Sequence, residues 1–413
     1  MFSKDHKGHV HHLLCVDIGT HSIKACIFEE NEDCLSLKGL QSIPQQFGNI
    51  QGGTIVDISQ TSDNIKAAVK EVETKAKVSP RQMVIGVSGK MIKGMSVTLD
   101  YLRSHPEKEI AAQELKTIIY ELQWKAFELI RSELAEEMGM PALELKLINA
   151  SIISVRVDDV QVKNPKGLRG EKVSIDIFNC FSPLQHFGQI QSLAVELSYH
   201  ELKGVFNQSF AVCHSLLLKN ALESAIVIDI GAGTTDICVI SNGKLIGNRS
   251  FSMAGNSLSK RISYELSTSF EDAEAVKLSY SANSLEKQSQ NAIREALQSD
   301  IDIWISSLEF SLKELPMQKL PSKLLLCGKS HLLPEFQRAL KAYDWGQHFP
   351  VEDEEIAIRP LDYSDILEGD FDAEHFDPQY LPLLAVANTA FDLLYHNPEL
   401  DTILNTIIAD KGL

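Results

Sequence analysis

Apolar residues along this chain fall into short continuous runs and into stripes with helical spacing. The runs Leu13 to Ile18 and Ile23 to Phe28 predict two strands joined by a tight turn, which is a hairpin. Between Ser62 and Val78 the apolar positions follow the spacing of one helix face, which predicts an amphipathic helix. Met83 to Val87 predicts the next buried strand. These elements predict a first folded unit over residues 13–89.

Residues 90–200 have a different pattern. A long helix is expected from about residue 111 to residue 138, with Pro141 after it. Short strands are then expected at 145–148, 152–157, 172–178 and 191–197. The Pro- and Gly-rich stretch Asn164-Pro-Lys-Gly-Leu-Arg-Gly170 predicts a turn between two of these strands. We interpret the block as a small inserted α+β domain.

The pattern of the opening hairpin then recurs. Ala225 to Ile230 and Ile237 to Ile240 predict strands around the turn Asp229-Ile-Gly-Ala-Gly-Thr-Thr-Asp236. A third strand at 245–251, helices near 257–266, 269–278 and 291–315, a strand at 324–327 and a helix at 333–343 complete a second unit, residues 201–395. The recurrence of an Asp-x-Gly hairpin predicts an internal duplication with a cleft between the two halves.

The two turns carry groups suited to phosphate. Gly231 and Gly233 permit positive φ and let the backbone approach a ligand closely, and successive backbone N–H groups in such a turn can bind an anion. Thr234 and Thr235 add hydroxyl donors. One turn of this kind could be only a hairpin. Two of them, each after a buried strand, together with the loop Cys327-Gly-Lys-Ser330, favour a binding site.

Charged residues beside the turns suit a metal-bound phosphate. Asp229 can hold a hydrated Mg²⁺ that is shared with phosphate oxygens, and Asp17 would face it from the other half. Lys24 could neutralise another phosphate. The sequence therefore predicts a phosphate and magnesium site between the two halves.

Composition narrows the class of protein. The chain has 413 residues, of which 44% are hydrophobic and 23% charged, as in globular proteins of two or three domains. The net charge of −17 disfavours binding to nucleic acid or to anionic lipid. Seven cysteines without a Cys-x-x-Cys pair indicate reduced, packed thiols rather than zinc or disulfide sites. With neither a signal-peptide core nor a membrane span in the sequence, we expect a cytoplasmic protein. Residues 1–12, with His6, His9, His11 and His12, are expected to be a frayed tail or an adventitious metal binder.

Three motifs resemble the nucleotide-binding motifs of the actin-like ATPase superfamily. Asp17-Ile-Gly-Thr-His-Ser-Ile-Lys24 resembles its first phosphate motif, Asp229 to Asp236 its second, and Leu324-Leu-Leu-Cys-Gly-Lys-Ser330 its adenosine motif. Glu274 and Lys277 match its purine- and ribose-side pair, or form only a solvated ion pair on a helix.

This resemblance implies an α/β, actin-like two-lobe fold of duplicated ribonuclease H-like domains that binds ATP and Mg²⁺. The implied nucleotide-binding residues are Asp17, Gly19, Thr20, His21, Lys24, Asp229, Gly231, Ala232, Gly233, Thr234, Thr235, Gly255, Asn256, Glu274, Lys277, Gly328, Lys329 and Ser330. Asp17 and Asp229 would hold Mg²⁺ through water. No catalytic residue is assigned, because no position for a water-orienting residue is evident.

Within the superfamily the chain most resembles the FtsA family of bacterial cell-division proteins. The matching segments are Gly52-Gly-Thr-Ile-Val-Asp57, Val84 to Lys93, Asn164 to Gly170 and Met253-Ala-Gly-Asn256, and they occur in order. The resemblance implies self-association into actin-like filaments, linkage of FtsZ to the cytoplasmic face of the membrane at the division site, and slow or absent ATP hydrolysis. It also implies an FtsA-type inserted domain at 90–200.

Several positions depart from the family pattern. Ala232 and Ala254 stand where glycine is usual, and Lys329 replaces the second glycine of the adenosine motif, so its side chain would crowd the adenine. The end of the chain, residues 396–413, has an apolar stripe but only one base, Lys411. A membrane helix prefers cations, so we expect either a helix that docks on a partner or a weak, indirect membrane attachment.

Two further questions stay open from the sequence. Residues 352–377 hold eleven acids and one base, Arg359, and form either a solvated loop or a face for a basic partner. A PilM-like pilus or secretion assembly protein, docking on an inner-membrane partner, is the alternative function. A small-molecule kinase of the same superfamily is a third, for which the sequence shows no substrate base.

Overall fold

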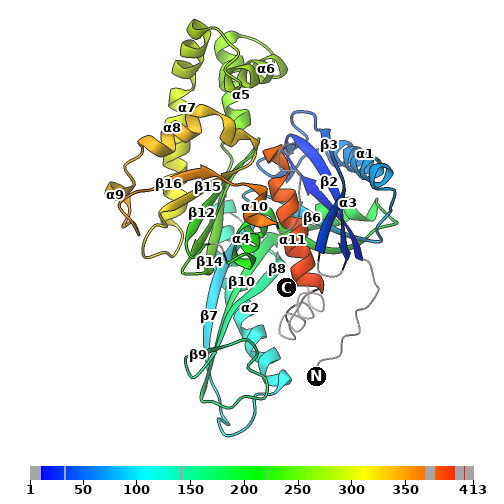
Figure 1. The fold of residues 1–413 in the computed structure, drawn as a ribbon, viewed down its shortest axis with the longest axis vertical. Coiled ribbons are helices and arrows are strands. Elements are labelled where there is room, and N and C mark those ends of the chain that lie inside the picture. The colour runs from blue at the N-terminus through cyan, green and yellow to red at the C-terminus, as the bar shows by residue number, and fades with distance from the viewer. Residues whose placement is uncertain are drawn as a thin grey trace.

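The computed structural model describes residues 11–31, 34–139, 143–220, 222–367 and 377–395, together with Leu404. Its strands form two large sheets with helices packed on and between them (Figure 1). The first sheet has five strands in the order β11-β6-β1-β2-β3. Their bounds are β1 (His11–Ile18), β2 (Ser22–Asn31), β3 (Cys34–Pro44), β6 (Gln82–Val87) and β11 (Glu201–Asn207).

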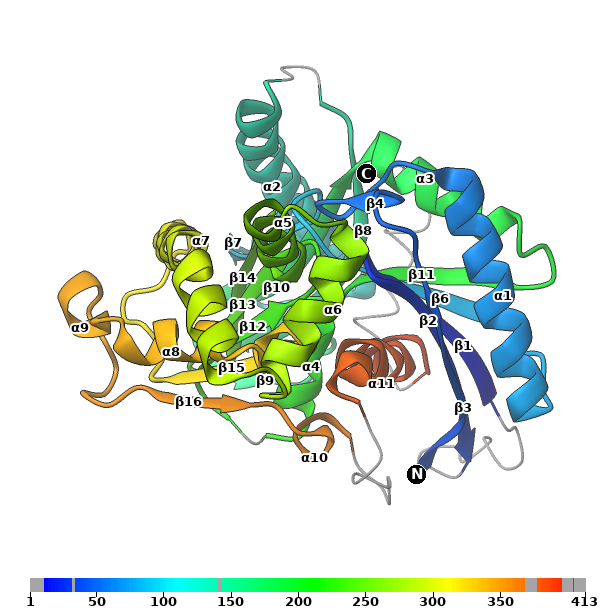
Figure 2. The ribbon, with the colours of Figure 1, turned by 90° about the horizontal axis from the view of Figure 1, so that it is seen from above.

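The predicted opening hairpin is confirmed by the antiparallel pairing of β1 with β2, in which Asp17 lies opposite Lys24. Strand β6 pairs with β1 in parallel, and the chain reaches β6 from β3 through a helical connection. That connection is α1 (Ile58–Ala76), which begins where the Asp57 side chain accepts a hydrogen bond from the Gln60 backbone N–H. It packs against β2 and β3, while α11 (Leu381–Tyr395) covers the other face of this sheet (Figure 2).

The second sheet has nine strands in the order β16-β15-β12-β13-β14-β7-β10-β8-β9. Strands β12 to β16 of this sheet come from the predicted second unit, and strands β7 to β10 come from the predicted inserted domain. The bounds are β7 (Lys93–Leu102), β8 (Leu145–Val157), β9 (Val160–Val162), β10 (Lys172–Pro183), β12 (Ala225–Ile230), β13 (Thr235–Ser241), β14 (Lys244–Phe251), β15 (Lys323–Cys327) and β16 (Ala357–Pro360). A separate small hairpin pairs β4 (Ile50–Gln51) with β5 (Thr54–Ile55).

The remaining helices cover these sheets. They are α2 (Ala112–Met138), α3 (Leu184–Val195), α4 (Gln208–Leu218), α5 (Gly255–Leu266), α6 (Phe270–Ser281), α7 (Lys287–Lys313), α8 (Pro334–Ala342), α9 (Trp345–His348) and α10 (Tyr363–Ile366), with the short turns η1 (Lys329–Leu332) and η3 (Pro378–Tyr380). Helix α4 contacts strands of both sheets and α11, so it fills the space between the two halves. Trp304 of α7 is fully buried in the core of the second half.

The two parts of the nine-stranded sheet are joined narrowly. Strands β14 and β7 pair through only Gly247 with Met95 and Asn248 with Gly94. A Cβ at Gly94 would lie 2.5 Å from Asn248 Oδ1, so the close approach of these strands requires glycine there.

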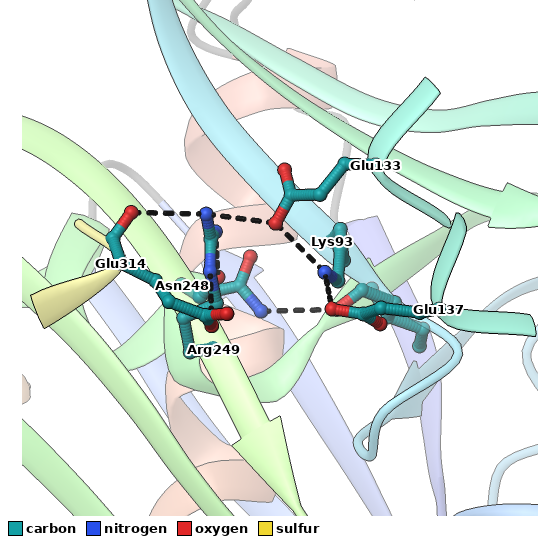
Figure 3. Close-up of polar contacts among 7 residues, drawn as sticks. Lys93, Glu133, Glu137, Asn248, Arg249 and Glu314 are labelled. Carbon is teal, nitrogen blue, oxygen red and sulfur yellow. Dashed lines mark hydrogen bonds and ion pairs between the residues drawn. The ribbon is translucent and has the colours of Figure 1, made fainter. Parts of the chain in front are cut away.

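Buried charges surround this joint (Figure 3). Glu133 of α2 accepts from Lys93 Nζ at 2.8 Å and lies 2.9 Å from Arg249 Nη2. Lys93 also pairs with Glu137, and Arg249 Nε lies 3.4 Å from Glu314. The two cations are only 5% and 6% exposed. The inserted helix is therefore tied to β7 and β14 by ion pairs in which the cations are buried and the carboxylates are partly exposed.

One predicted strand is wrong. Residues 191–197 belong largely to helix α3, in which Ile190, Leu193 and Ala194 are buried on one face. A short apolar run fits a strand and a buried helix equally well, and this one continues a helical stripe that begins before it. The two strands expected at 145–148 and 152–157 form one strand, β8, whose pairing with β10 is irregular at two points.

The domain division stays a prediction, but the sheets cut across its boundaries. Strand β11 pairs with β6 in the first sheet, although residues 201–207 were assigned to the second unit. His11 and His12, expected in a tail, lie in β1, and His12 Nε2 is 2.9 Å from Glu29. The other two histidines of that cluster lie outside the described residues.

Parts of the remaining sequence predictions can be compared with the structure. The acidic stretch contains β16 and α10 in its described part, and Arg359 makes a two-point ion pair with Asp365, so it is not simply a solvated loop. Residues 368–376, and 396–413 except Leu404, lie outside the described ranges. The six cysteines with described side chains are buried and free, as predicted. Over the described ranges, no helix is both long and apolar enough to cross a membrane.

Candidate functional site

A pocket of about 160 Å³ lies between the two halves, at the turns of the two Asp-x-Gly hairpins. Strands β1 and β12 deliver one turn each, helix α6 forms one wall, and the turn after β15 forms another. The predicted residues that line it are Asp17, Gly19, Thr20, His21, Lys24, Asp229, Gly231, Ala232, Gly233, Thr234, Glu274, Lys277, Gly328, Lys329 and Ser330. Segments far apart in the sequence thus meet at one place.

The two turns approach each other closely. A Cβ on Gly233 would lie 2.6 Å from Thr20 Oγ1, so only glycine allows this approach. Gly231 donates its backbone N–H to Thr234 O at 3.0 Å, which closes the turn. Neither Gly231 nor Gly233 has a positive φ, so the conformational freedom that glycine permits is not used at either position. At Gly233, glycine is required by the close approach of Thr20 and not by the backbone conformation.

Asp17 is held by side chains from two elements. Lys24 Nζ donates to its Oδ2 at 2.6 Å, and Gln208 at the start of α4 donates to its Oδ1. Asp17 is 1% exposed, so these two donors satisfy a carboxylate that water hardly reaches. Lys24 lines the pocket and is also committed to Asp17, which places its positive charge beside the first turn.

Asp229 lies in a strongly acidic environment. Burial, and after it the nearby carboxylate of Asp236, raises the pKa of Asp229 to about 7, against the opposing effect of Lys24. Asp236 accepts from the Gly89 backbone N–H at 2.9 Å and from Thr234 Oγ1 at 2.8 Å. The carboxylates of Asp17, Asp229 and Asp236 therefore lie near one another with Lys24 beside them. A bound cation would reduce the repulsion among these carboxylates.

The residues present fit a hydrated magnesium ion better than a directly ligated one. Among the described residues, no group of three or more His, Cys, Asp or Glu side chains is arranged to hold a metal ion. Asp17 and Asp229 both line the pocket. Mg²⁺ usually keeps several waters and binds through one or two carboxylates plus phosphate oxygens. This donor set suits that mode.

Glu274 and Lys277 form a buried pair at the wall made by α6. Lys277 Nζ donates to Glu274 Oε2 at 2.7 Å, to Ser259 Oγ at 2.8 Å and to Gly255 O at 3.1 Å. Burial lowers the pKa of Lys277, and Glu274 partly offsets this effect. Lys277 is 5% exposed and both residues line the pocket. The alternative of a solvated ion pair on a free helix face is therefore wrong.

The turn after β15 packs against the second hairpin. Gly328 has φ +73°, and a Cβ there would lie 2.1 Å from Asp229 Oδ1, so glycine is required on both grounds. Lys329 lines the pocket, and its Nζ lies 3.2 Å from Asp377 Oδ2, just before η3. The lysine that replaces the expected glycine thus reaches across to the segment that leads into α11.

Three predicted residues do not line the pocket. Thr235 Oγ1 donates to Met253 O at 2.7 Å and accepts from Trp304 Nε1 at 2.9 Å, so its hydroxyl is used inside the core. Asn256 donates its backbone N–H to Ala232 O at 2.8 Å, and Gly255 donates to Gly231 O at 3.2 Å. Gly255 and Asn256 thus hold the backbone of the second turn by hydrogen bonds without lining the pocket.

Other lining residues were not predicted from the sequence. They are Ser22, Ser88, Gln208, Asp236, Leu278, Ser281, Leu332, Leu333, Gln379 and Pro382. Asp236 ends the second motif, and its position opposite Asp229 in the hairpin register was a usable signal. Gln208 and Gln379 come from α4 and η3, and no local pattern in the sequence shows that these segments reach the pocket.

An aromatic contact spans the opening between the halves. Phe47, in the loop after β3, stacks on Phe270 at the start of α6, with ring centroids 3.8 Å apart and planes inclined by 21°. Lys260 Nζ lies 5.4 Å from the Phe47 ring centroid. Phe47 is nevertheless 48% exposed. This contact ties the first half to α5 and α6 at the surface.

Sequence comparisons confirm the resemblance to FtsA. A family model described as "Cell division protein FtsA" matches residues 226–338. The cell division protein FtsA of Bacillus subtilis (strain 168) is 26% identical over 267 residues, which cover 63% of this chain and 56% of that protein. FtsA of Streptococcus pneumoniae serotype 2 is 27% identical over 273 residues, covering 64% and 55%. The chain thus spans little more than half the length of these curated relatives.

Comparisons with solved structures show the fold. A PilM-PilN type IV pilus biogenesis complex matches with TM-score 0.64 and 18% identity, covering 91% of this chain and 98% of that chain. The ethanolamine utilization protein EutJ from Carboxydothermus hydrogenoformans matches with TM-score 0.51 and 13% identity, covering 91% and 89%. The predicted actin-like α/β fold is confirmed.

Proposed function

We propose that this chain, an actin-like protein whose sequence resembles FtsA, binds ATP with Mg²⁺ and acts in bacterial cell division. It would self-associate along an actin-like axis and link FtsZ to the cytoplasmic face of the membrane at the division site. The observation that carries the proposal is the meeting of the two phosphate motifs and the adenosine motif in one pocket. The FtsA match over 226–338 includes the second phosphate motif and the adenosine motif.

We assign each part of the nucleotide to residues that line the pocket. The backbone N–H groups and hydroxyls of the two turns would hold the phosphates, and Asp17 and Asp229 would hold the waters of Mg²⁺. Glu274 and Lys277 would lie beside the purine and ribose. The metal would supply positive charge to the phosphate oxygens. We assign no catalytic residue, and we expect slow hydrolysis or none.

Nucleotide would act mainly as a clamp between the two halves. The pocket is lined from both halves, so a ligand that contacts both turns binds their closed arrangement better than an open one. The difference in binding free energy between the closed and open arrangements sets the limit on how strongly nucleotide could change filament or partner contacts. Attachment to the membrane would be weak or indirect.

The substitution Gly233→Asp tests the pocket. Its carboxylate would enter the phosphate turn and its Cβ would meet Thr20, so we expect ATP affinity to fall by about a hundredfold or more, roughly 3 kcal/mol. Isothermal titration calorimetry with Mg²⁺ measures it. Gly188→Asp in α3 is the matched control, because no atom lies within 4 Å of a Cβ there. Unchanged affinity in a folded Gly233→Asp protein would refute the assignment.

Affinity capture from a native lysate with ATP present tests the partner. Recovery of FtsZ supports the division function. The structural similarity to a PilM-PilN complex motivates the alternative, a pilus or secretion assembly protein, which recovery of a pilus inner-membrane protein would support. Capture with the Gly233→Asp protein shows whether either partner depends on nucleotide.

A further inference from the structure

Residues 377–382 form one wall of the nucleotide pocket, and we call them the wall segment. They contain η3 and the start of α11, and two of them, Gln379 and Pro382, line the pocket. Helix α11 packs on β1, β2 and β6, so the wall segment is fixed to the first half of the molecule. It shares the lining of the pocket with the motifs of the second half.

Asp377 sets the conformation of the wall segment. Its carboxylate accepts hydrogen bonds from the Gln379 backbone N–H at 3.0 Å and from Gln379 Nε2 at 2.9 Å. Its carbonyl oxygen accepts from the Tyr363 hydroxyl at 2.6 Å. Tyr363 begins α10, which contacts α11 (Figure 1). A change in the position of Asp377 would therefore move Gln379, which lines the pocket.

Lys329 contacts the wall segment from the other half. It lies in the turn after β15 and lines the pocket, and its Nζ is 3.2 Å from Asp377 Oδ2. Strand β15 belongs to the nine-stranded sheet, whereas α11 packs on the five-stranded sheet. The ion pair of Lys329 with Asp377 thus joins the two halves at the edge of the pocket.

The exposure of this ion pair suits a contact that opens and closes. The side chains of Lys329 and Asp377 are 46% and 34% exposed, so water can solvate both charges when they separate. Exposed ion pairs contribute little free energy, and exposed side chains change rotamer within nanoseconds. A glycine at position 329, which the adenosine motif of the resembled superfamily has, could not make this contact.

We infer that the ion pair of Lys329 with Asp377 holds the wall segment against the second half, and that nucleotide enters and leaves when this pair opens. The inference rests on the proposed nucleotide site. Lys329 is then a positioning residue, which acts on the nucleotide through Asp377 and Gln379. The pair is closed in both the free and the bound protein and open only while nucleotide passes. Breaking it should therefore raise the association and dissociation rates together and change affinity little.

Stopped-flow fluorescence with an ATP analogue and Mg²⁺ measures both rates on the full chain. Lys329→Gln and Asp377→Asn should each raise both rate constants by roughly two- to fivefold, the effect expected of an exposed ion pair, with an unchanged ratio. Lys329→Arg keeps the charge and should restore slow exchange. The control is Lys66→Gln, which removes a similarly exposed pair with Glu196 outside the pocket and should leave both rates unchanged.

The double variant Lys329→Gln with Asp377→Asn should behave like either single variant, because all three lack the same ion pair. Additive effects would show that the two residues act separately, and wild-type rates in both single variants would show no role, so each result overturns the inference. Weaker affinity at an unchanged association rate would mean that Lys329 binds the nucleotide directly, which also overturns it. If the wild-type protein itself does not bind the analogue, the proposed function fails and the inference fails with it.

Discussion

At the residue scale, the fold strongly changes the ionisation of the Asp229 carboxyl group. Its pKa in the folded chain is about 7, against an ordinary value of 3.8. Below about pH 4 the Asp229 carboxyl group is protonated in both the folded and the unfolded chain, so it does not lower the free energy of unfolding. As pH rises from about 4 to about 7, the unfolded chain ionises while the folded chain resists, so the free energy of unfolding falls; above about pH 7 both states are ionised and the loss is complete.

We therefore expect the nucleotide-free protein to lose stability, by up to a few kcal/mol, between about pH 4 and pH 8. Asp229→Asn should flatten this dependence, and saturating Mg²⁺ and ATP should flatten it in the wild type. Urea unfolding across this pH range measures the effect. Asp302→Asn, at an exposed position on α7, is the control and should keep the wild-type slope. An Asp229→Asn slope equal to that of wild type would contradict the assigned pKa.

The sequence predicted the residue types at the pocket well and their individual roles less well. Asp17, Asp229 and Lys277 were found because each lies in a local pattern, a strand followed by a glycine turn or a spacing on one helix face. Thr235 was assigned to the ligand because a hydroxyl suits phosphate, yet its hydroxyl bonds within the core. Gln208 was missed because its contact with Asp17 joins residues 191 positions apart.

At the scale of elements, the joint between β14 and β7 depends on few hydrogen bonds and many charges. Only two residue pairs of the backbone ladder connect the strands, Ser96 Oγ also donates to Leu245 O, and Glu133 of α2 bridges Lys93 and Arg249 beside them. Removing Glu133 would leave each of the two buried cations with one carboxylate instead of two, Glu137 for Lys93 and Glu314 for Arg249, which weakens the network. The joint is therefore sensitive to a single carboxylate.

Glu133→Gln tests this dependence. We expect it to lower the free energy of unfolding by about 2 kcal/mol, because two buried cations lose their shared anion. The control is Glu128→Gln on the same helix, whose ion pair with Arg131 is exposed and should be worth less than about 1 kcal/mol. Urea unfolding gives both values. If Glu128→Gln costs as much as Glu133→Gln, the buried network is not what secures the joint.

Element types were predictable wherever the apolar pattern was long. The helices at 62–78, 111–138 and 291–315 were expected from their spacing and occur as α1, α2 and α7. The strand expected at 191–197 failed because a short apolar run does not distinguish a strand from a buried helix. Helix α11 was missed because its sequence is apolar almost all round, so it has no contrasting polar face.

At the scale of the whole molecule, the two halves are held closed at the surface as well as at the pocket. The stacked rings of Phe47 and Phe270, with Lys260 beside them, form the outer contact. Aromatic pairs contribute about 0.5–1.5 kcal/mol beyond the area they bury, and an exposed cation–π contact about 0.5–1 kcal/mol. Opening the cleft requires breaking these contacts.

Phe47→Ala should therefore speed the release of bound nucleotide, by roughly five- to thirtyfold for a loss of about 1–2 kcal/mol. Stopped-flow displacement of a fluorescent ATP analogue measures the rate. Phe310→Ala, which removes an exposed ring from α7, is the control and should leave the rate unchanged. The same release rate in both variants would show that the outer contact does not hold the cleft closed. The overall fold was predictable from the repeated hairpin, but this contact between distant loops was not.

Because the nine-stranded sheet is continuous, a rotation of its strands at the pocket would also move its far edge. From β12, at the pocket, to β9, at the far edge, there are six strand spacings, or about 29 Å at roughly 4.8 Å each. A rotation of about 5° at the pocket would then carry the far edge by about 2.5 Å, if the sheet turns as one piece at that spacing. The ion pairs of Lys93, Glu133 and Arg249 at the β14–β7 joint determine how rigidly the two parts of the sheet move together. A small adjustment around a nucleotide would thereby become a displacement as large as an atom at the tip of the inserted domain.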